Sequence, residues 1–397
     1  MVPQAVRTAA EALAVDNLER VLNAFRRARL ASHDLVGSEG YGYVDPGRDK
    51  LEGVYAELLG AEAALVRPQL VSGTHALAHM VRGVVERGQH LVLAGPVYDT
   101  LQGLMAPDSR HPLSLARQGV RLSSVPAGEE GLDRGAWEHA LAEAPDWVYL
   151  QRSRGYQRRP SWPIETLADW IDEAHRAGAQ VLVDNCYGEF THRSEPGHWG
   201  ADLLAGSLLK NPGGGLAPGG GYVAGRRRLI ERVADHLYAP GLGSGIGPSG
   251  PALRWYWQGL FYAPHAVTEA LIGSAEAAAL FSAAGFAVDP PPDAWPRPDI
   301  ILAVALDSQA QLLTALAAVQ EMSPLDSFVV PEPGPVPGYA SFVAMAASGF
   351  VPGGSLELSA DAPVAPPWTL YLQGGVMRQH TVLAARHILR RLGRAPA

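Results

Sequence analysis

Residues 181–226 read VLVDNCYGEFTHRSEPGHWGADLLAGSLLKNPGGGLAPGGGYVAGR. The apolar run 181–183 ends in Asp184 and Asn185, which is typical of a buried parallel strand that carries polar groups at its carboxyl end. Lys210 follows a run of small residues, 205–207, and precedes a segment too rich in glycine to form a regular helix. The stretch therefore predicts a strand, a carboxylate at its end, and a lysine in a loop beyond it.

Lys210 stands out because the chain carries nearly all its positive charge on arginine, and Lys50 is its only other lysine. An amine between apolar residues and a glycine loop suits a Schiff-base lysine, which reacts only when it is partly desolvated beside an apolar cofactor. Asp184 would then keep the nitrogen of a pyridine ring protonated, because a carboxylate favours the charged form of its neighbour. The alternative is that Asp184 caps a helix and Lys210 is a surface lysine in a turn.

Length and composition exclude several classes of protein. A chain of 397 residues suits one large domain with a smaller second one. A net charge of −8 without basic clusters argues against nucleic acid as a partner, and no run of eighteen apolar residues predicts a membrane span. Residues 1–30 mix apolar and charged residues at helical spacing and lack the uninterrupted apolar core of a signal peptide, so we expect a cytoplasmic protein. The single cysteine, Cys186, agrees with this, because it cannot form an intramolecular disulfide or a cysteine-based zinc site. We expect no metal.

A second candidate site begins at Ser72, Gly73 and Thr74, which open a predicted helix. A small hydroxyl residue followed by glycine exposes backbone N–H groups at the positive end of the helix dipole, where a phosphate can bind. An ordinary helix cap explains the same residues equally well. Tyr98 follows the predicted strand 91–93, and its ring could either lie on a pyridine ring or pack in the core.

The loop from residue 37 to residue 48 alternates glycine with aromatic residues and contains Tyr41, Tyr43 and Arg48. Such a loop is costly to leave unpacked, although glycine-rich surface loops are also common. It leads into a helix that begins at Asp49 and carries apolar residues on one face.

Strands alternate with helices through the first two thirds of the chain. Such an order means right-handed βαβ units, a parallel sheet covered on both faces, and a ligand site beyond the carboxyl ends of the strands. A proline-dense linker at 289–292 marks a boundary, so we expect an N-terminal helix and loop (1–48), a large α/β domain (49–288) and a small α+β domain (289–397). The expected helices are 5–30, 134–143, 164–177, 267–284, 309–322 and 378–392, and the expected strands include 120–122, 147–150, 300–304, 355–358 and 369–372.

Several linked motifs together resemble one family: GYGYVDPGRDKLE, VSGTHAL, GPVYDTL, QRSRGY, VDNCYGEF, GSLLKNPGGGLAP and YLQGG. In this order the chain resembles the pyridoxal-phosphate enzymes of the cystathionine β-lyase and methionine γ-lyase group, in its aluminium-resistance branch. The resemblance implies the aspartate-aminotransferase fold (fold type I). It also implies that Lys210 anchors the cofactor, Asp184 holds the ring nitrogen and Tyr98 stacks on the ring. Ser72, Gly73, Thr74 and Ser207 would bind the phosphate.

The resemblance further implies a homodimer or homotetramer in which the loop with Tyr41, Tyr43 and Arg48 reaches into a neighbour's site. Where related lyases have Tyr-x-Arg, this chain has Tyr41-Gly42-Tyr43, so Arg48 could supply the missing charge. Arg152 and Arg378 are both candidates for the substrate's carboxylate. The implied reaction is elimination of a thiol from a sulfur-containing amino acid. An aminotransferase or decarboxylase on the same scaffold is the alternative, because a fold does not fix the reaction.

Overall fold

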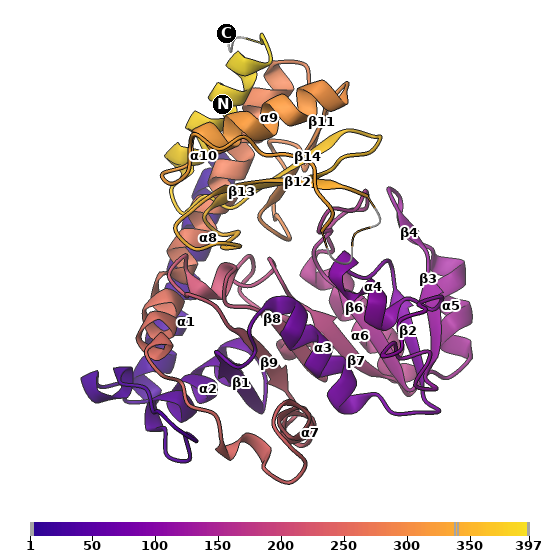
Figure 1. Ribbon diagram of the computed structural model, residues 1–397. Coiled ribbons are helices and arrows are strands. Elements are labelled where there is room, and N and C mark those ends of the chain that lie inside the picture. The colour runs from indigo at the N-terminus through magenta and orange to yellow at the C-terminus, as the bar shows by residue number, and fades with distance from the viewer. Residues whose placement is uncertain (1–3, 337–338, 340, 395–397) are drawn as a thin grey trace.

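A seven-stranded sheet forms the centre of the larger part of the protein, in a computed structural model that describes residues 4–336, 339 and 341–394 (Figure 1). The strand order is β1-β9-β8-β7-β6-β2-β3. Neighbours from β8 to β3 run parallel, whereas β9 runs antiparallel to both β8 and β1. The strands are β1 (Ala63–Arg67), β2 (His90–Ala94), β3 (Arg121–Val125), β6 (Trp147–Gln151), β7 (Gln180–Asp184), β8 (Leu203–Ser207) and β9 (Gly221–Gly225).

Helices cover this sheet, as the alternating sequence pattern predicted. The helix α3 begins just after its cap Ser72 and packs against β8 and β9, because its apolar residues recur at helical spacing and are buried. The other helices of this part are α2 (Pro46–Leu59), α4 (Gln102–Met105), α5 (Arg134–Ala142), α6 (Ile164–Arg176) and α7 (Arg227–Leu237), with α3 at Gly73–Val84. The predicted mostly parallel, doubly covered sheet is therefore confirmed.

Two long helices run side by side and connect the parts. The helix α1 (Gln4–Arg27) packs along α8 (Ala252–Ala283), where Phe25 meets Trp257 edge to face at 5.2 Å between ring centroids. By length and composition α8 could cross a membrane, but 67% of its most apolar window is buried inside the protein, as in a core helix. Its residues up to Leu271 belong to the large core, and those from Ala277 onward belong to the small one.

The smaller part is an antiparallel sheet of order β10-β11-β14-β13-β12, covered by α9 (Gln309–Glu321) and α10 (Arg378–Arg391). Its strands are β10 (Val288–Asp289), β11 (Ile301–Ala305), β12 (Val343–Ser348), β13 (Leu358–Pro363) and β14 (Thr369–Gln373). A second apolar core lies between this sheet and its helices.

The predicted element boundaries were wrong at several places. The strand expected at 355–358 is β13 and begins only at Leu358. The long helix begins at Ala252 rather than at residue 267. The helix α7, Arg227–Leu237, was not among the predicted helices.

Candidate functional site

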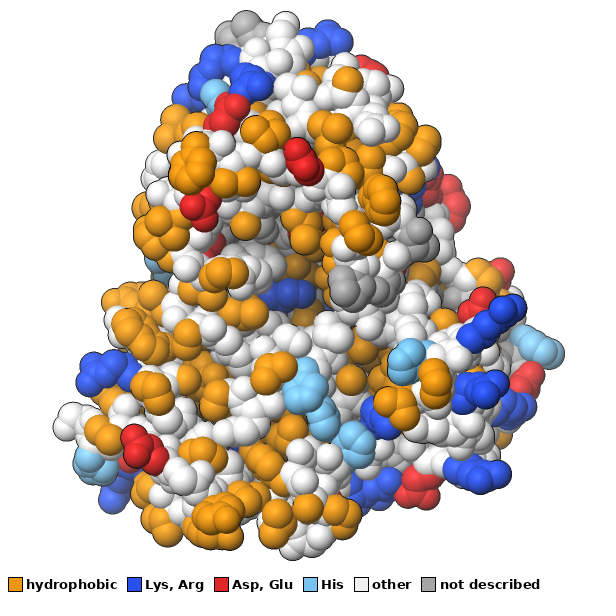
Figure 2. Space-filling view, viewed as in Figure 1, with side chains coloured by type: hydrophobic (Ala, Val, Ile, Leu, Met, Phe, Trp, Pro, Cys, Tyr) orange, Lys and Arg blue, Asp and Glu red, His pale blue; other side chains and the backbone are white. Residues whose placement is uncertain are grey.

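A cavity of about 350 Å³ lies between the two parts, beyond the carboxyl ends of the parallel strands. The hollow is visible in Figure 2 below the smaller part of the molecule. Among the residues that line it are seven that the sequence predicted: Ser72, Gly73, Thr74, Tyr98, Asp184, Ser207 and Lys210. Residues far apart in the chain therefore meet at the edge of the sheet where a ligand was expected.

Lys210 is held at this cavity by the loop that follows β8. Its backbone stands just before a short turn, where the side chain of Asn211 donates hydrogen bonds of 2.9 Å to the carbonyls of Tyr187 and Glu189. These bonds tie the lysine loop to the loop after β7. The Lys210 amine lies 3.7 Å from the ring centroid of Tyr187 and 5.6 Å from that of Tyr98.

Asp184 is the last residue of β7 and is buried. Its Oδ1 accepts a hydrogen bond from the backbone N–H of Cys186 at 3.0 Å, and its Oδ2 lies 3.5 Å from the hydroxyl of Tyr149. Burial raises the pKa of Asp184, and the nearby Lys210 opposes this shift. A positive charge placed beside this carboxylate would therefore stabilise it.

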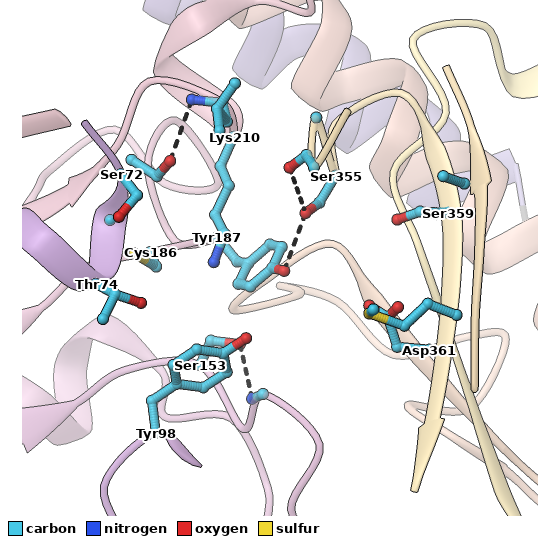
Figure 3. Close-up of a pocket in the computed structure, with 18 of the residues that line it drawn as sticks. Ser72, Thr74, Tyr98, Ser153, Cys186, Tyr187, Lys210, Ser355, Ser359 and Asp361 are labelled. Carbon is cyan, nitrogen blue, oxygen red and sulfur yellow. Dashed lines mark hydrogen bonds between the residues drawn. The ribbon is translucent and has the colours of Figure 1, made fainter. Parts of the chain in front are cut away.

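The first turn of α3 and the end of β8 form a narrow cradle. Ser72 caps the helix, and its hydroxyl accepts from the backbone N–H of His75 at 3.1 Å. A Cβ atom on Gly73 would lie 2.9 Å from the Cβ of Ser207, so no side chain fits there without a shift. Figure 3 shows Ser72 and Thr74 together on one side of the cavity, with Lys210 and Tyr187 between them and Asp361.

Two aromatic residues of the cavity accompany Tyr98 and were not predicted. Tyr187 has a backbone φ of 70°, an uncommon conformation that places its ring under Lys210. The ring of Tyr156 lies 6.1 Å from that of Tyr98. The motif after Asp184 contained a signal for Tyr187, because an aromatic residue just beyond a strand end lies at the same sheet edge.

The opposite wall of the cavity belongs to the smaller sheet and carries the buried carboxyl group of Asp361. Its Oδ2 accepts hydrogen bonds from the hydroxyl of Tyr156 and the amide of Gln373. Burial raises the pKa of Asp361 to about 6. The alternation of β13 was a possible signal, since Ala360 and Ala362 enter the core while Ser359 and Asp361 line the cavity.

The two arginines predicted to hold a carboxylate do not line this cavity, so that expectation is corrected. The guanidinium of Arg152 is buried and donates to Asn185 and Thr191 at 3.0 Å each. It lies against Gly188, where a Cβ would come within 2.5 Å of its Cδ. Arg378 begins α10 and faces Glu11 and Glu269 at 3.6 and 3.7 Å. Both side chains therefore have their polar partners within the chain and away from the cavity.

The predicted tyrosine loop also lies outside the cavity of its own chain. Tyr41 and Tyr43 are 70% and 66% exposed and stack on each other at 5.4 Å. Arg48 is buried, and its Nη1 donates to the carbonyls of Gly42 and Gly247 at 2.8 Å each. The structure thus gives Arg48 a different role from the expected one: it fixes the loop and leaves the tyrosines facing outward.

Comparisons with known proteins agree with the geometry of the site. A family model described as methionine gamma-lyase matches residues 3–393. The uncharacterized protein YnbB of Bacillus subtilis is 39% identical over 375 residues, which are 93% of this chain and 89% of that protein.

Solved structures give the same result. A Listeria innocua protein assigned as a cystathionine beta-lyase involved in aluminum resistance is 38% identical, with a TM-score of 0.93 over 99% of this chain and 96% of that one. A carbon-sulfur lyase involved in aluminum resistance from Clostridium novyi NT is 38% identical, with a TM-score of 0.91 over 97% and 92% of the two chains. The chain belongs to the methionine gamma-lyase family of pyridoxal-phosphate-dependent carbon-sulfur lyases.

Proposed function

We propose that this chain eliminates a thiol from a sulfur-containing amino acid in the cavity around Lys210. The observation that carries the proposal is the meeting of Lys210, Asp184 and the cradle at Gly73 in one buried cavity. The reaction is of the methionine γ-lyase or the cystathionine β-lyase type, and both consume water and leave a 2-oxo acid, ammonia and a thiol.

The residues of the cavity fit pyridoxal phosphate. Gly73 has no side chain, and a Cβ there would meet Ser207, so the cradle stays open beside it; Ser72, Thr74 and Ser207 offer hydroxyl groups, and the start of the helix offers backbone N–H groups, to a phosphate. Asp184 is a buried carboxylate that would gain from a protonated ring nitrogen. When bound, the cofactor withdraws electrons from the amino acid and makes its α-proton acidic.

The chain's own groups supply the remaining steps. Lys210 Nζ takes the α-proton and returns protons within the cavity, since it is the only lysine or arginine among the described residues that line it. Tyr98 presents its ring to the cofactor, and Asp184 keeps the ring nitrogen protonated. The serine hydroxyls of the opposite wall, Ser355 and Ser359, offer hydrogen bonds to the substrate's carboxylate in place of an arginine.

Lys210→Ala tests the assignment directly. We expect this variant to lose formation of pyruvate or 2-oxobutyrate and release of thiol. It should also lose the covalent cofactor adduct that borohydride traps in the wild type. Lys50→Arg is the matched control, because Lys50 is the only other lysine and pairs with Asp34. A trapped adduct that persists in Lys210→Ala would overturn the assignment.

The same assay separates the alternative activities. An aminotransferase would need a second oxo acid and would release no thiol, and a decarboxylase would release carbon dioxide. The family comparison does not favour either alternative.

We also propose that the protein works as a cytoplasmic homodimer or homotetramer and that Tyr41 and Tyr43 act in a neighbour's site. Their exposure, on a loop that Arg48 and Gly247 hold in place, supports a contact with a second copy. Mixing Lys210→Ala with a Tyr41→Ala/Tyr43→Ala variant under subunit exchange should restore part of the activity. The mixed dimer has one site with both Lys210 and an intact loop. No recovery after demonstrated exchange would mean that the loop does not act in trans.

A further inference from the structure

A second cavity, of about 400 Å³, shares one segment of chain with the cavity around Lys210. In the segment that follows β6, Ser153 and Gly155 line the cavity around Lys210, whereas Arg154 between them lines the second one. The two linings have no residue in common in the described part of the chain. We call the second space the arginine cavity; it is separate from the site described above and lies beside it.

The wall of the arginine cavity that belongs to the smaller sheet is made by small side chains. Along β11, Leu302 and Val304 enter the small core. Ala303 and Ala305 alternate with them and therefore lie on the opposite face, which lines the cavity. Tyr371 of β14 pairs with Ala303 and lines the same wall. Because alanine fills little space, this face leaves an apolar surface on which a ligand can lie.

The lining of the arginine cavity carries an excess of positive charge. Its charged side chains, among the described residues, are Arg154, Arg158, Arg159, Glu129 and Asp289. Arg154 forms an ion pair with Asp289. Arg158 forms one with Glu129. Arg159 has no carboxylate partner in the described part of the chain, and it donates instead to a side-chain amide oxygen and to backbone carbonyls. One positive charge is therefore left without a counter-charge.

Arg154 keeps unused hydrogen-bond donors although it is only 5% exposed. Within the described residues its side chain donates from Nη2 alone, and its Nε is buried without an acceptor. Burial and the neighbouring charge of Arg154 lower the pKa of Arg159 to about 9, so Arg159 is still charged at neutral pH. An anion beside these two guanidinium groups would reduce their repulsion and accept the unused hydrogen bonds.

We propose that the arginine cavity is a second ligand site, which binds a small carboxylate with a hydrocarbon body. The guanidinium groups of Arg154 and Arg158 suit the two oxygens of a carboxylate. The Arg158–Glu129 pair is exposed on both sides, at 57% and 63%, so Arg158 can turn to a ligand at little cost. Ala303 and Ala305 would cover the hydrocarbon, whereas inorganic phosphate would leave this apolar wall bare. The inference goes beyond the proposed function and does not depend on it.

The two cavities are joined by an aromatic contact as well as by the chain. The ring of Tyr371, in the arginine cavity, lies 5.6 Å from that of Tyr156, in the cavity around Lys210, between centroids. Tyr156 in turn donates to Asp361 on the opposite wall. The arginine cavity also bridges the two parts of the protein, because Arg154 follows β6 and Tyr371 belongs to the smaller sheet. We therefore expect ligands of the two cavities to change each other's affinity.

The binding test uses the holoenzyme and butyrate, which has no amino group that could react with the cofactor. Calorimetric titration should show one saturable site per chain. Butyramide has nearly the same shape without the charge, and inorganic phosphate has the charge without the hydrocarbon. Each should bind at least about tenfold more weakly than butyrate. Equal binding of butyramide or of phosphate would overturn the assigned ligand class, and this comparison needs no variant.

Arg158→Gln tests where butyrate binds. The Arg158 side chain is 57% exposed, so the substitution removes a charge and leaves the core intact. The Kd for butyrate should rise at least about tenfold in this variant. It should stay unchanged in Arg228→Gln, at an exposed arginine of α7, and in Lys210→Ala, because Lys210 lines the other cavity. Binding that Arg158→Gln leaves unchanged, or that Lys210→Ala abolishes, would assign butyrate to the cavity around Lys210 and overturn the inference.

The coupling between the cavities is measured on turnover and on cofactor absorbance. Butyrate in the arginine cavity should change kcat rather than raise KM alone, and Arg158→Gln should remove this effect. Purely competitive inhibition that persists in Arg158→Gln would overturn the inference. Butyrate that binds but leaves kcat, KM and cofactor absorbance unchanged would overturn the coupling. Calorimetry needs no turnover, so a failure of the proposed lyase activity would be distinguished from a failure of this site.

Discussion

Asp184 lies at the buried end of its strand, where its negative charge is stabilised only when a positive group lies beside it. Among the described residues its hydrogen-bond donors are the backbone N–H of Cys186 and the hydroxyl of Tyr149 at 3.5 Å, and burial raises its pKa. We expect Asp184→Asn to reduce turnover by about a hundredfold or more, because a neutral amide does not stabilise a protonated ring nitrogen. The free energy of unfolding of the cofactor-free protein should change little, since the amide avoids the cost of burying a charge. Steady-state assays and urea unfolding measure the two effects, and near-normal turnover would contradict the assigned role.

Glu189 provides a separate prediction about stability and pH. Its carboxyl is buried behind β8, accepts from the hydroxyl of Tyr222 at 2.8 Å, and has its pKa raised to about 8 by burial. The folded state keeps this proton up to about pH 8, whereas the unfolded chain releases it near 4.5. The unfolded state binds fewer protons in this window, so the free energy of unfolding should fall as pH rises from 4.5 to about 8.

Urea unfolding at several pH values checks this slope. Glu189→Gln should flatten it, because the amide does not titrate, and Glu138→Gln, at an exposed residue of α5, should not. An equal slope in both variants would show that the dependence arises elsewhere.

At the scale of elements, the loop before α2 is joined by backbone hydrogen bonds to residues 247–250. Tyr41 accepts from the N–H of Gly247, and Ser38 accepts from that of Gly250. Gly42 has a φ of 65°, and a Cβ there would lie 2.5 Å from the backbone nitrogen of Pro248. Gly40 has nearly the same φ, 64°, with no atom within 4 Å of such a Cβ.

Substitutions at these two glycines distinguish the cost of backbone strain, which both share, from the cost of the close contact, which only Gly42 makes. Gly40→Ala should cost about 1–2 kcal/mol, the usual penalty of the left-handed conformation. Gly42→Ala should cost more, because the loop must also move away from Pro248, and it should reduce activity by displacing Tyr41 and Tyr43. Thermal unfolding and lyase assays on both variants measure the difference. Equal losses would mean that the contact with Pro248 is unimportant.

The elements that local sequence patterns could predict were those with clear apolar periodicity, such as β7, α3 and α9. In the sequence, the strand β8 is recognisable only as a run of small residues and was not predicted as a strand. It has glycine at position 206 because a Cβ there would come within 2.5 Å of the Glu189 carboxylate, which is a constraint from packing. The position of the Arg152 side chain is likewise set by packing. Only the folded chain shows that the small Gly188 lets this arginine turn away from the cavity.

At the scale of the whole molecule, α8 joins two apolar cores. Leu260 and Val267 belong to the large core, and Ala278 and Phe281 to the small one. We expect one unfolding transition, because neither core can lose its part of α8 independently. Phe281→Ala should destabilise the protein by about 3–5 kcal/mol and lower the midpoint reported by tryptophans of the large core. Phe328→Ala, at a residue 83% exposed, is the control. Two separate transitions would contradict this coupling.

The pairing of α1 with α8 also sets an order of events during synthesis. The apolar residues of α1, among them Val6, Ala10 and Leu13, leave the ribosome long before the helix that buries them, which begins at Ala252. At about 5–20 residues per second, α1 waits on the order of ten seconds or more for this partner. During that interval the apolar face of α1 is exposed and can associate with other nascent chains. Production at high levels should therefore depend on a chaperone that covers the first helix until α8 has emerged.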